Sequence, residues 1–143
     1  MGTPVDLMAR LLAPDELASI VNLHEFEAPA RARMTGPNFD YLAGGSWDEI
    51  TLAENDAAWR EFRFAYRVLT EIRAVDVSGS FLGRSSTLPI AIAPMAAQAM
   101  AHPDAEGAMA RAAAAAGVPL VRSTSAALTV EAVAEAAPAA DRL

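Results

Sequence analysis

Two apolar runs are each followed by small or polar residues that could bind a ligand. The run Leu88–Ala93 leads into the small residues 93–97, and the run Val118–Val121 leads into residues 122–125, which are an arginine, two serines and a threonine. Both runs are typical of strands, and the segment between them is typical of a helix. In strand–helix–strand units, ligands bind at the carboxyl ends of the strands. We therefore expect the functional residues at these two strand ends.

The helix between the runs has clear start and stop signals. Pro103 and Asp104 suit its start, because proline lacks no needed donor there and a carboxylate complements the helix dipole. The segment continues on alanine, the best helix former, and Gly117 is placed to end it. The run before it shows no polar alternation, as expected for a parallel strand buried on both faces. This part of the chain therefore predicts strand, loop, helix and strand.

The composition excludes several classes of function. The 143 residues carry a formal net charge of −7, and every basic residue is an arginine. Because phosphate contacts need a basic face, we expect no nucleic-acid partner. The chain has no cysteine, so it offers no thiolate metal site and no cysteine nucleophile, and we assign no metal ligand. The apolar runs are too short for a membrane span, and the first residues lack a signal-peptide pattern, so we expect a cytoplasmic location.

The first 63 residues are expected to form a helical section. The expected helical segments are Asp6–Leu12, Pro14–Val21, Leu23–Met34, Phe39–Ala43 and a helix that opens at Ser46. Asn22 is suited to cap the third segment. Ser46, with Glu49 three places on, fits a capping box.

The rest of the chain divides into two further sections. Residues 64–87 predict an extended segment followed by a small hairpin that turns near Gly83. Residues 88–143 hold the strand–helix–strand unit and a last helix over Val130–Ala137. The expected organisation is therefore a helical section over 1–63, an extended section with a hairpin, and a strand–helix–strand section.

Five motifs occur in the order that one protein family shows. They are Asn22-Leu23-His24-Glu25-Phe26-Glu27, Phe39-Asp40-Tyr41-Leu42-Ala43-Gly44-Gly45, Thr51-Leu52-Ala53-Glu54-Asn55, Leu88-Pro89-Ile90-Ala91-Ile92-Ala93-Pro94-Met95-Ala96 and Ala101-His102-Pro103-Asp104. Together they resemble the FMN-dependent α-hydroxy acid dehydrogenase/oxidase family, which includes glycolate oxidase, lactate oxidase and flavin-dependent lactate dehydrogenase. The resemblance covers about residues 20 to 137, and several motifs in one order make it specific.

The resemblance implies an α/β fold, namely a partial TIM barrel with FMN as cofactor. The helical section and a β-hairpin plug would precede the first two β/α units of a (β/α)8 barrel. The backbone of Ala93, Pro94, Met95 and Ala96 would lie against the flavin ring, and Ser123 would hydrogen-bond it. Small side chains let the backbone approach a flat ring closely, and a serine hydroxyl both donates and accepts.

The resemblance also implies a substrate contact. Tyr41 would bind the carboxylate of a small 2-hydroxy acid, to which a tyrosine hydroxyl can donate a charge-assisted hydrogen bond. On the residues alone, Tyr41 better fits a packing aromatic on a short helix, and Ser123 fits a residue that simply ends a strand. The match to the family favours the two ligand roles.

The family chemistry needs groups that this sequence does not supply. In the family, a histidine base assisted by an aspartate, arginines that hold the substrate and a lysine near flavin N1 come from later barrel strands. This chain has no lysine, and neither His24 nor His102 matches the base. We therefore predict the N-terminal portion of an enzyme that oxidises a small L-2-hydroxy acid to the 2-oxo acid, with no catalytic residue of its own and no turnover alone.

A non-catalytic alternative stays open. The chain would then be a truncated remnant, or a half-barrel that binds flavin weakly or pairs with a complementary chain. Two parallel strands leave open edges and are not stable by themselves, so we expect either self-association into a homo-oligomer or a complementary half-barrel chain as partner.

Two positions near Ser123 depart from the family pattern. Arg122 stands where the family usually has an apolar residue, and Ser125 stands where an aromatic residue or methionine is common. A guanidinium inside a barrel strand costs several kcal/mol unless it is paired. Arg122 is therefore expected to be an oddity of this chain rather than a ligand-binding residue.

Overall fold

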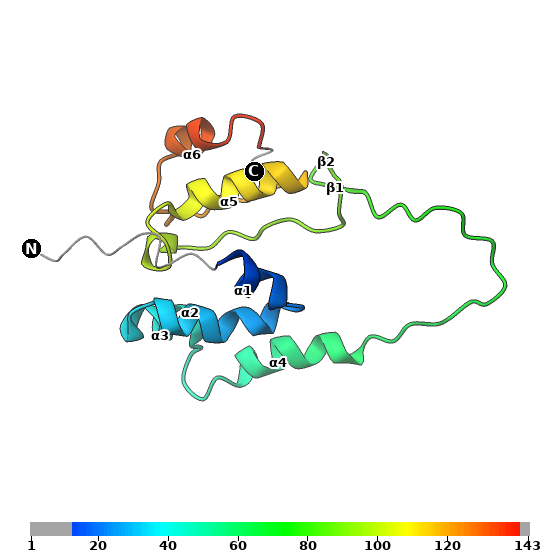
Figure 1. Ribbon diagram of the computed structural model, residues 1–143, viewed down its shortest axis with the longest axis horizontal. Coiled ribbons are helices and arrows are strands. Elements are labelled where there is room, and N and C mark those ends of the chain that lie inside the picture. Colours follow the sequence, from blue (N-terminus) through cyan, green and yellow to red (C-terminus); the bar gives the residue numbers. More distant parts are fainter. Residues whose placement is uncertain (1–12, 141–143) are drawn as a thin grey trace, which may run out of the picture. The chain divides into compact units, whose positions relative to one another are not determined.

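The structure of the protein is a computed structural model that describes residues 13–140 (Figure 1). Two compact units divide the described chain. The first consists of the residues up to Met34 together with those from Asp76 onward, and the second is Thr35–Val75. The expected helix Asp6–Leu12 lies outside the described residues. The sections 1–63, 64–87 and 88–143 remain a prediction about organisation along the chain.

The first unit contains the predicted strand–helix–strand arrangement. Ile92 and Leu120 form a parallel bridge. The Ile92 N–H donates to the Pro119 carbonyl at 2.8 Å, and the Val121 N–H donates to the Ile92 carbonyl at 2.9 Å. Helix α5, Ala105–Ala116, makes the crossover between these two segments, preceded by the short 3₁₀ helix η4, Gln98–Met100. The parallel direction of the two runs is therefore confirmed.

The two runs are extended segments rather than the full strands expected from the sequence. They meet at a single bridge, and the sheet in the described part of the chain is the two-stranded hairpin described below. Pro89 lies in the first run and Pro94 directly follows it, and Pro119 lies in the second run. Because proline has no N–H, it cannot donate to a ladder, which limits how far the pairing extends.

Helix α5 ends as predicted. Gly117 follows Ala116 with φ of +66°, a left-handed conformation that glycine adopts without strain. The Gly117 carbonyl accepts from the Thr87 N–H at 3.0 Å, and the Thr87 hydroxyl donates to the Ala116 carbonyl at 2.5 Å. A Cβ on Gly117 would lie only 2.6 Å from Thr87 Cγ2. The end of α5 is therefore joined tightly to the residue before Leu88.

The core of the first unit lies between α5, the second run and helix α6, Val130–Ala136. Its buried members are Ala110, Ala113, Val118, Leu120, Val133, Ala137 and Ala140. Alanines on α5 leave room for close approach, and Leu120 and Val133 fill the space with larger side chains. Thr129 caps α6, since its hydroxyl accepts from the Ala132 N–H at 3.2 Å. The predicted last helix is confirmed to within one residue.

The predicted hairpin is also present. Strands β1, Gly79–Phe81, and β2, Arg84–Ser86, pair antiparallel with Ser80 opposite Ser85. Leu82 and Gly83 form the turn with positive φ values of 48° and 79°. Two consecutive left-handed residues are typical of the tight hairpin turn that matches strand twist. The turn near Gly83 is therefore confirmed.

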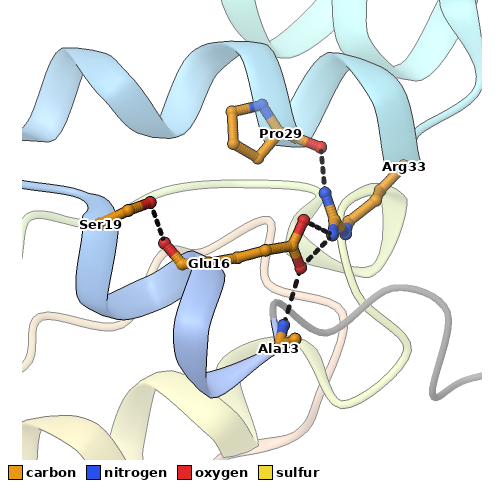
Figure 2. A network of polar contacts seen from close by, with 5 residues as sticks. All are labelled: Ala13, Glu16, Ser19, Pro29 and Arg33. Carbon is orange, nitrogen blue, oxygen red and sulfur yellow. Dashed lines mark hydrogen bonds and ion pairs between the residues drawn. The ribbon is translucent and has the colours of Figure 1, made fainter.

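A polar network joins the N-terminal helices of the first unit (Figure 2). These are α1, Pro14–Ser19, the 3₁₀ helix η2, Leu23–Phe26, and α2, Glu27–Arg33. The Glu16 carboxylate accepts from the Ala13 N–H at 2.8 Å and from Arg33 Nη2 at 2.7 Å, while Arg33 Nη1 donates to the Pro29 carbonyl. Asn22 caps η2 as predicted, accepting from the Glu25 N–H at 3.3 Å.

The second unit carries α3, Gly36–Ala43, α4, Ile50–Ala58, and the 3₁₀ helix η3, Trp59–Glu61. The capping box expected at Ser46 is wrong. Trp47 and Glu49 adopt left-handed conformations, so the helix starts only at Ile50. The Glu49 carboxylate instead accepts from the Gly45 N–H at 2.9 Å. Beyond η3 the chain is extended and exposed up to β1 (Figure 1).

None of the helices within residues 13–140 has the length and apolar character needed to cross a membrane.

Candidate functional site

The two strand ends singled out in the sequence lie side by side. The parallel bridge aligns the two runs, so both strand ends are at the same edge. Beyond it, the Ala97 N–H donates to the Ser125 carbonyl at 3.4 Å. The loop that follows Ile92 and the loop that follows Leu120 are thus joined directly. They form one surface within the first unit.

The first loop is held from within by a glutamine that the sequence analysis missed. Gln98 is 6% exposed, and its side-chain amide donates to the Met95 carbonyl at 3.3 Å. Ala97 adopts a left-handed conformation with φ of 56° and leads into η4. Ala93, Pro94 and Met95 remain exposed. The loop therefore presents small apolar side chains on a backbone that is fixed by a buried amide.

The second loop runs over residues 123–128 and is held by a buried carboxylate. Glu106, in the first turn of α5, is 2% exposed. Its two carboxylate oxygens accept from the Ala127 and Leu128 N–H groups, each at 3.0 Å. Sequence reasoning did not single out Glu106, because a glutamate near a helix start ordinarily faces solvent. An isolated buried charge would be costly, whereas two donors stabilise it.

Arg122 is half-buried and holds the same loop from the other side. Its Nη1 donates to the Ser123 carbonyl at 3.2 Å and its Nη2 to the Leu128 carbonyl at 2.5 Å, while Nε is buried with no hydrogen-bond partner in the described residues. The charge also helps to lower the pKa of Glu131, after the larger effects of that residue's own N–H and the Thr129 hydroxyl. Arg122, which the sequence analysis expected to be an oddity of this chain, therefore has a structural role.

Ser123 has one hydrogen-bonding function engaged and one available. Its Oγ accepts from the Ser125 N–H at 3.1 Å, a local turn typical of serine. No described contact uses its hydroxyl hydrogen as a donor. A ligand with an acceptor at this edge could therefore take this hydrogen bond.

A hollow of about 400 Å³ lies between the first run and the hairpin. Its lining is mainly apolar and includes Phe81, Leu88, Ile90, Ile92 and Val121. Ala93 and Pro94 also line it, whereas the other sequence-predicted site residues are not part of its wall. Ile90 is 58% exposed, which is unusual for an aliphatic residue inside a strand-like run. The hollow is an open apolar surface that meets the expected ligand edge at Ala93 and Pro94.

Tyr41 belongs to the second unit and is described there by itself. It lies on α3 and is 63% exposed, whereas Phe39 on the same helix is 5% exposed. Phe39 is therefore the packing aromatic of this helix. Tyr41 is therefore not the packing aromatic expected from the residues alone, and its side chain is largely exposed.

The two histidines show no catalytic arrangement. His102 Nδ1 accepts from the Asp104 N–H at 3.1 Å just before α5, and His24 lies exposed in η2. Within residues 13–140 there is no cluster of three potential metal ligands among histidine, aspartate and glutamate. The chemistry that the described site can supply is therefore binding by the two loops, without an evident base.

The residues of the two loops fit a flat ring with a polar edge. Ala93, Pro94 and Met95 are exposed side chains that allow a planar group to approach the backbone. Ser123 follows the second run at the same edge, and its hydroxyl, which accepts from the Ser125 N–H, still has its hydrogen to donate. Buried Gln98 and Glu106 fix both loops in place. The groups that the two loops present suit the ring of an aromatic cofactor. None of them is assigned to the phosphate of such a cofactor.

Comparisons with known proteins show which family the chain resembles. The family model described as FMN-dependent dehydrogenase matches residues 30–143. Glycolate oxidase 1 of Oryza sativa subsp. indica is 42% identical over 122 residues, which are 85% of this chain and 33% of that protein. L-lactate oxidase of Nostoc sp. is 40% identical over 119 residues, 83% of this chain and 33% of that protein. The chain thus spans about a third of the length of the curated relatives it matches.

Solved structures show the same likeness. A mandelate oxidase superposes with a TM-score of 0.77 at 37% identity, covering 82% of this chain and 34% of that one. A flavocytochrome b2 variant with sulfite bound gives a TM-score of 0.83 at 30% identity, covering 88% of this chain and 34% of that one. These matches support an α/β fold for the chain.

Proposed function

The chain belongs to the FMN-dependent dehydrogenase family, and from this premise we propose that it provides part of the FMN site of an enzyme that oxidises a small L-2-hydroxy acid to the 2-oxo acid. The single observation that carries the proposal is the contact between the two loops. The Ala97 N–H donates to the Ser125 carbonyl, beside the parallel bridge of Ile92 and Leu120. A flavin ring could therefore contact both loops at once. The complete fold around them would be a (β/α)8 barrel, of which this chain holds the first two units.

The proposed cofactor contacts follow from the exposed groups of the loops. The backbone of Ala93, Pro94, Met95 and Ala96 lies against the ring, and Ser123 donates its free hydroxyl hydrogen to an acceptor on the ring's polar edge. When bound, FMN supplies the capacity to accept two electrons from the hydroxy acid. The role of this chain is to hold and orient the ring.

The proposed substrate contact is Tyr41. Its exposed hydroxyl would donate to the carboxylate of the hydroxy acid, and a charge-assisted bond of this kind is about twice as strong as a neutral one. The support is the exposure of Tyr41 on α3 and the names of the relatives, which act on glycolate and lactate. The general base and the carboxylate-binding arginines are proposed to lie outside the residues described, so we expect no turnover from this chain alone.

An FMN titration tests the cofactor proposal. Addition of the purified chain to FMN should quench flavin fluorescence, and Ser123→Ala should weaken binding about fivefold, the cost of one hydrogen bond near 1 kcal/mol. Ser85→Ala is the matched control, because Ser85 is an exposed hydroxyl on β2. Absence of quenching with the wild-type chain contradicts the proposal for this chain. Reduction of a dye with L-lactate or glycolate by the same preparation would contradict the predicted inactivity.

A second proposal concerns the polypeptide that covers the hollow. The exposed side chains of Leu88 and Ile90, together with Phe81 at 43% exposure, favour a polypeptide surface over solvent at this position. We propose that later barrel units cover it, whether they follow in the same chain or belong to a complementary half-barrel. Co-expression of such a half should yield a complex with one FMN and hydroxy acid oxidation, and a mixture that stays separate on gel filtration would contradict it.

The expected cytoplasmic location remains a prediction, to be checked by fractionation of the producing cell.

A further inference from the structure

Several backbone groups of the loop 123–128 are hydrogen-bonded. The Ser123 carbonyl accepts from the Ala126 N–H at 3.3 Å as well as from Arg122, and the Ser125 carbonyl accepts from Ala97. Glu106 holds the N–H groups at the far end, as described above. A loop with so many internal bonds loses little further entropy when a ligand binds.

Arg122 is the one side chain that bonds both ends of this loop. Its two terminal nitrogens donate to the carbonyls of Ser123 and Leu128, five residues apart. The guanidinium is planar and its donors form a fixed fork, so the two carbonyls are held in one relative position. A lysine carries the same charge on a single nitrogen and does not reproduce this fork.

We infer that Arg122 is a positioning residue for the Ser123 hydroxyl, and that it fixes the loop 123–128 in the conformation that binds the cofactor ring. The inference rests on the proposed function of Ser123 as a donor to FMN. Arg122 holds the Ser123 carbonyl, and the Ser125 N–H occupies the acceptor side of Ser123 Oγ. The remaining hydroxyl hydrogen is then free to donate to a ligand.

A double-mutant cycle tests whether Arg122 acts through Ser123. FMN affinity is measured by fluorescence for the wild-type chain, Arg122→Leu, Ser123→Ala and the double variant. Arg122→Leu should weaken binding about five- to tenfold when Ser123 is present, and less than about twofold when Ser123 has been replaced by alanine. If Arg122→Leu weakened FMN binding by the same factor in the wild-type and the Ser123→Ala chains, Arg122 would contribute only general stability. That result would overturn the inference.

Two further variants separate the fork from the charge and from the fold. Arg122→Lys should weaken binding as much as Arg122→Leu, and wild-type affinity in the lysine variant would overturn the inference. Arg122→Lys takes the place of Arg122→Leu in the double-mutant cycle if Arg122→Leu does not fold. Glu135→Gln is the matched control, because it removes an exposed charge on α6 that no described contact joins to Arg122 or to the loop. Its FMN affinity should equal that of the wild-type chain.

Amide hydrogen exchange without FMN distinguishes failure of the inference from failure of the proposed function. Arg122→Leu or Arg122→Lys should speed exchange of the Ser125 and Ala126 amides about tenfold, while amides in the centre of α5 stay protected. If the wild-type chain does not bind FMN, the proposed cofactor role fails and this exchange result alone decides whether Arg122 fixes the loop. Unchanged exchange at Ser125 and Ala126 overturns the inference whatever the affinity for FMN.

Discussion

At the scale of single residues, several buried polar groups hold backbone and not ligand. Gln98, Glu106 and Arg122 each bond to main-chain groups of the two loops. Removal of one partner from such a bond leaves a buried group unsatisfied, which costs about 1–3 kcal/mol. The exposed groups beside them, above all the Ser123 hydroxyl, are then the ones available for binding. Buried polar residues that hold the loops explain how two loops rich in alanine keep a defined shape.

Gly117→Ala should destabilise the protein by about 1–3 kcal/mol. The residue has φ of +66°, and the new Cβ would lie 2.6 Å from Thr87 Cγ2, so strain and a steric clash add. Urea unfolding followed by circular dichroism measures the loss. Gly36→Ala is the control, because a Cβ there meets nothing within 4 Å. Equal stabilities of the wild-type and Gly117→Ala chains would show that the close contact with Thr87 does not exist in solution.

At the scale of elements, the residues at the helix ends determine where each helix begins and ends. Asn22 caps its helix as the sequence predicts, and Thr129 also caps α6, because side-chain caps depend on residues a few positions apart. The Ser46 cap fails because left-handed backbone at Trp47 and Glu49 places the start of α4 at Ile50. Network bonds such as that of Glu16 with Arg33, 17 residues apart, join one helix to another and depend on packing.

The Glu16 network should make the stability of α1 dependent on pH. The N–H of Ala13 and, next, the Arg33 side chain lower the pKa of Glu16 from its ordinary 4.5. Because the folded state holds this proton less tightly than the unfolded state, the stabilisation is complete above pH 4.5 and is lost as the pH falls through the lowered value. NMR titration of the Glu16 carboxyl carbon should give a midpoint below 4.5.

Two variants test the cause of this shift. Arg33→Gln should raise the midpoint of Glu16 only partway, because the larger effect of the Ala13 N–H remains. Arg31→Gln lies on the same helix and pairs with Glu27, so it should leave the midpoint unchanged. A full return to 4.5 in the Arg33 variant would show that the arginine, and not the backbone bond, dominates.

At the scale of the whole molecule, the first unit has one well-packed side and one open side. Leu120 and Val133 are almost fully buried against α5 and α6, whereas Ile90 and Leu88 stand exposed at the hollow. Such an apolar surface is typical of one that another polypeptide covers. The curated relatives are about three times as long as their matched part.

Ile90→Ser should reduce self-association of the purified chain. The exposed isoleucine lines the hollow, and its replacement lowers the gain from burying this surface against a second copy. Light scattering after gel filtration should show a larger monomer fraction for the variant. Leu82→Ser is the control, since Leu82 is 78% exposed on the hairpin turn and does not line the hollow. A similar shift in both variants would mean that association does not use the hollow.

The sequence by itself determined the order and type of the local elements around the site. Alanine content with Gly117 specified α5 and its end, Gly83 indicated the hairpin turn, and the motif order indicated the family. These features depend on residues near one another in the chain, where propensity and turn chemistry act directly.

Only the tertiary structure decided what holds the two loops and which aromatic packs. Glu106 bonds amides about twenty residues further on, the role of Arg122 needs the Leu128 carbonyl beside it, and Phe39 rather than Tyr41 is buried on α3. Burial of a charged side chain becomes favourable only where distant backbone groups supply its partners, and no local pattern records those partners.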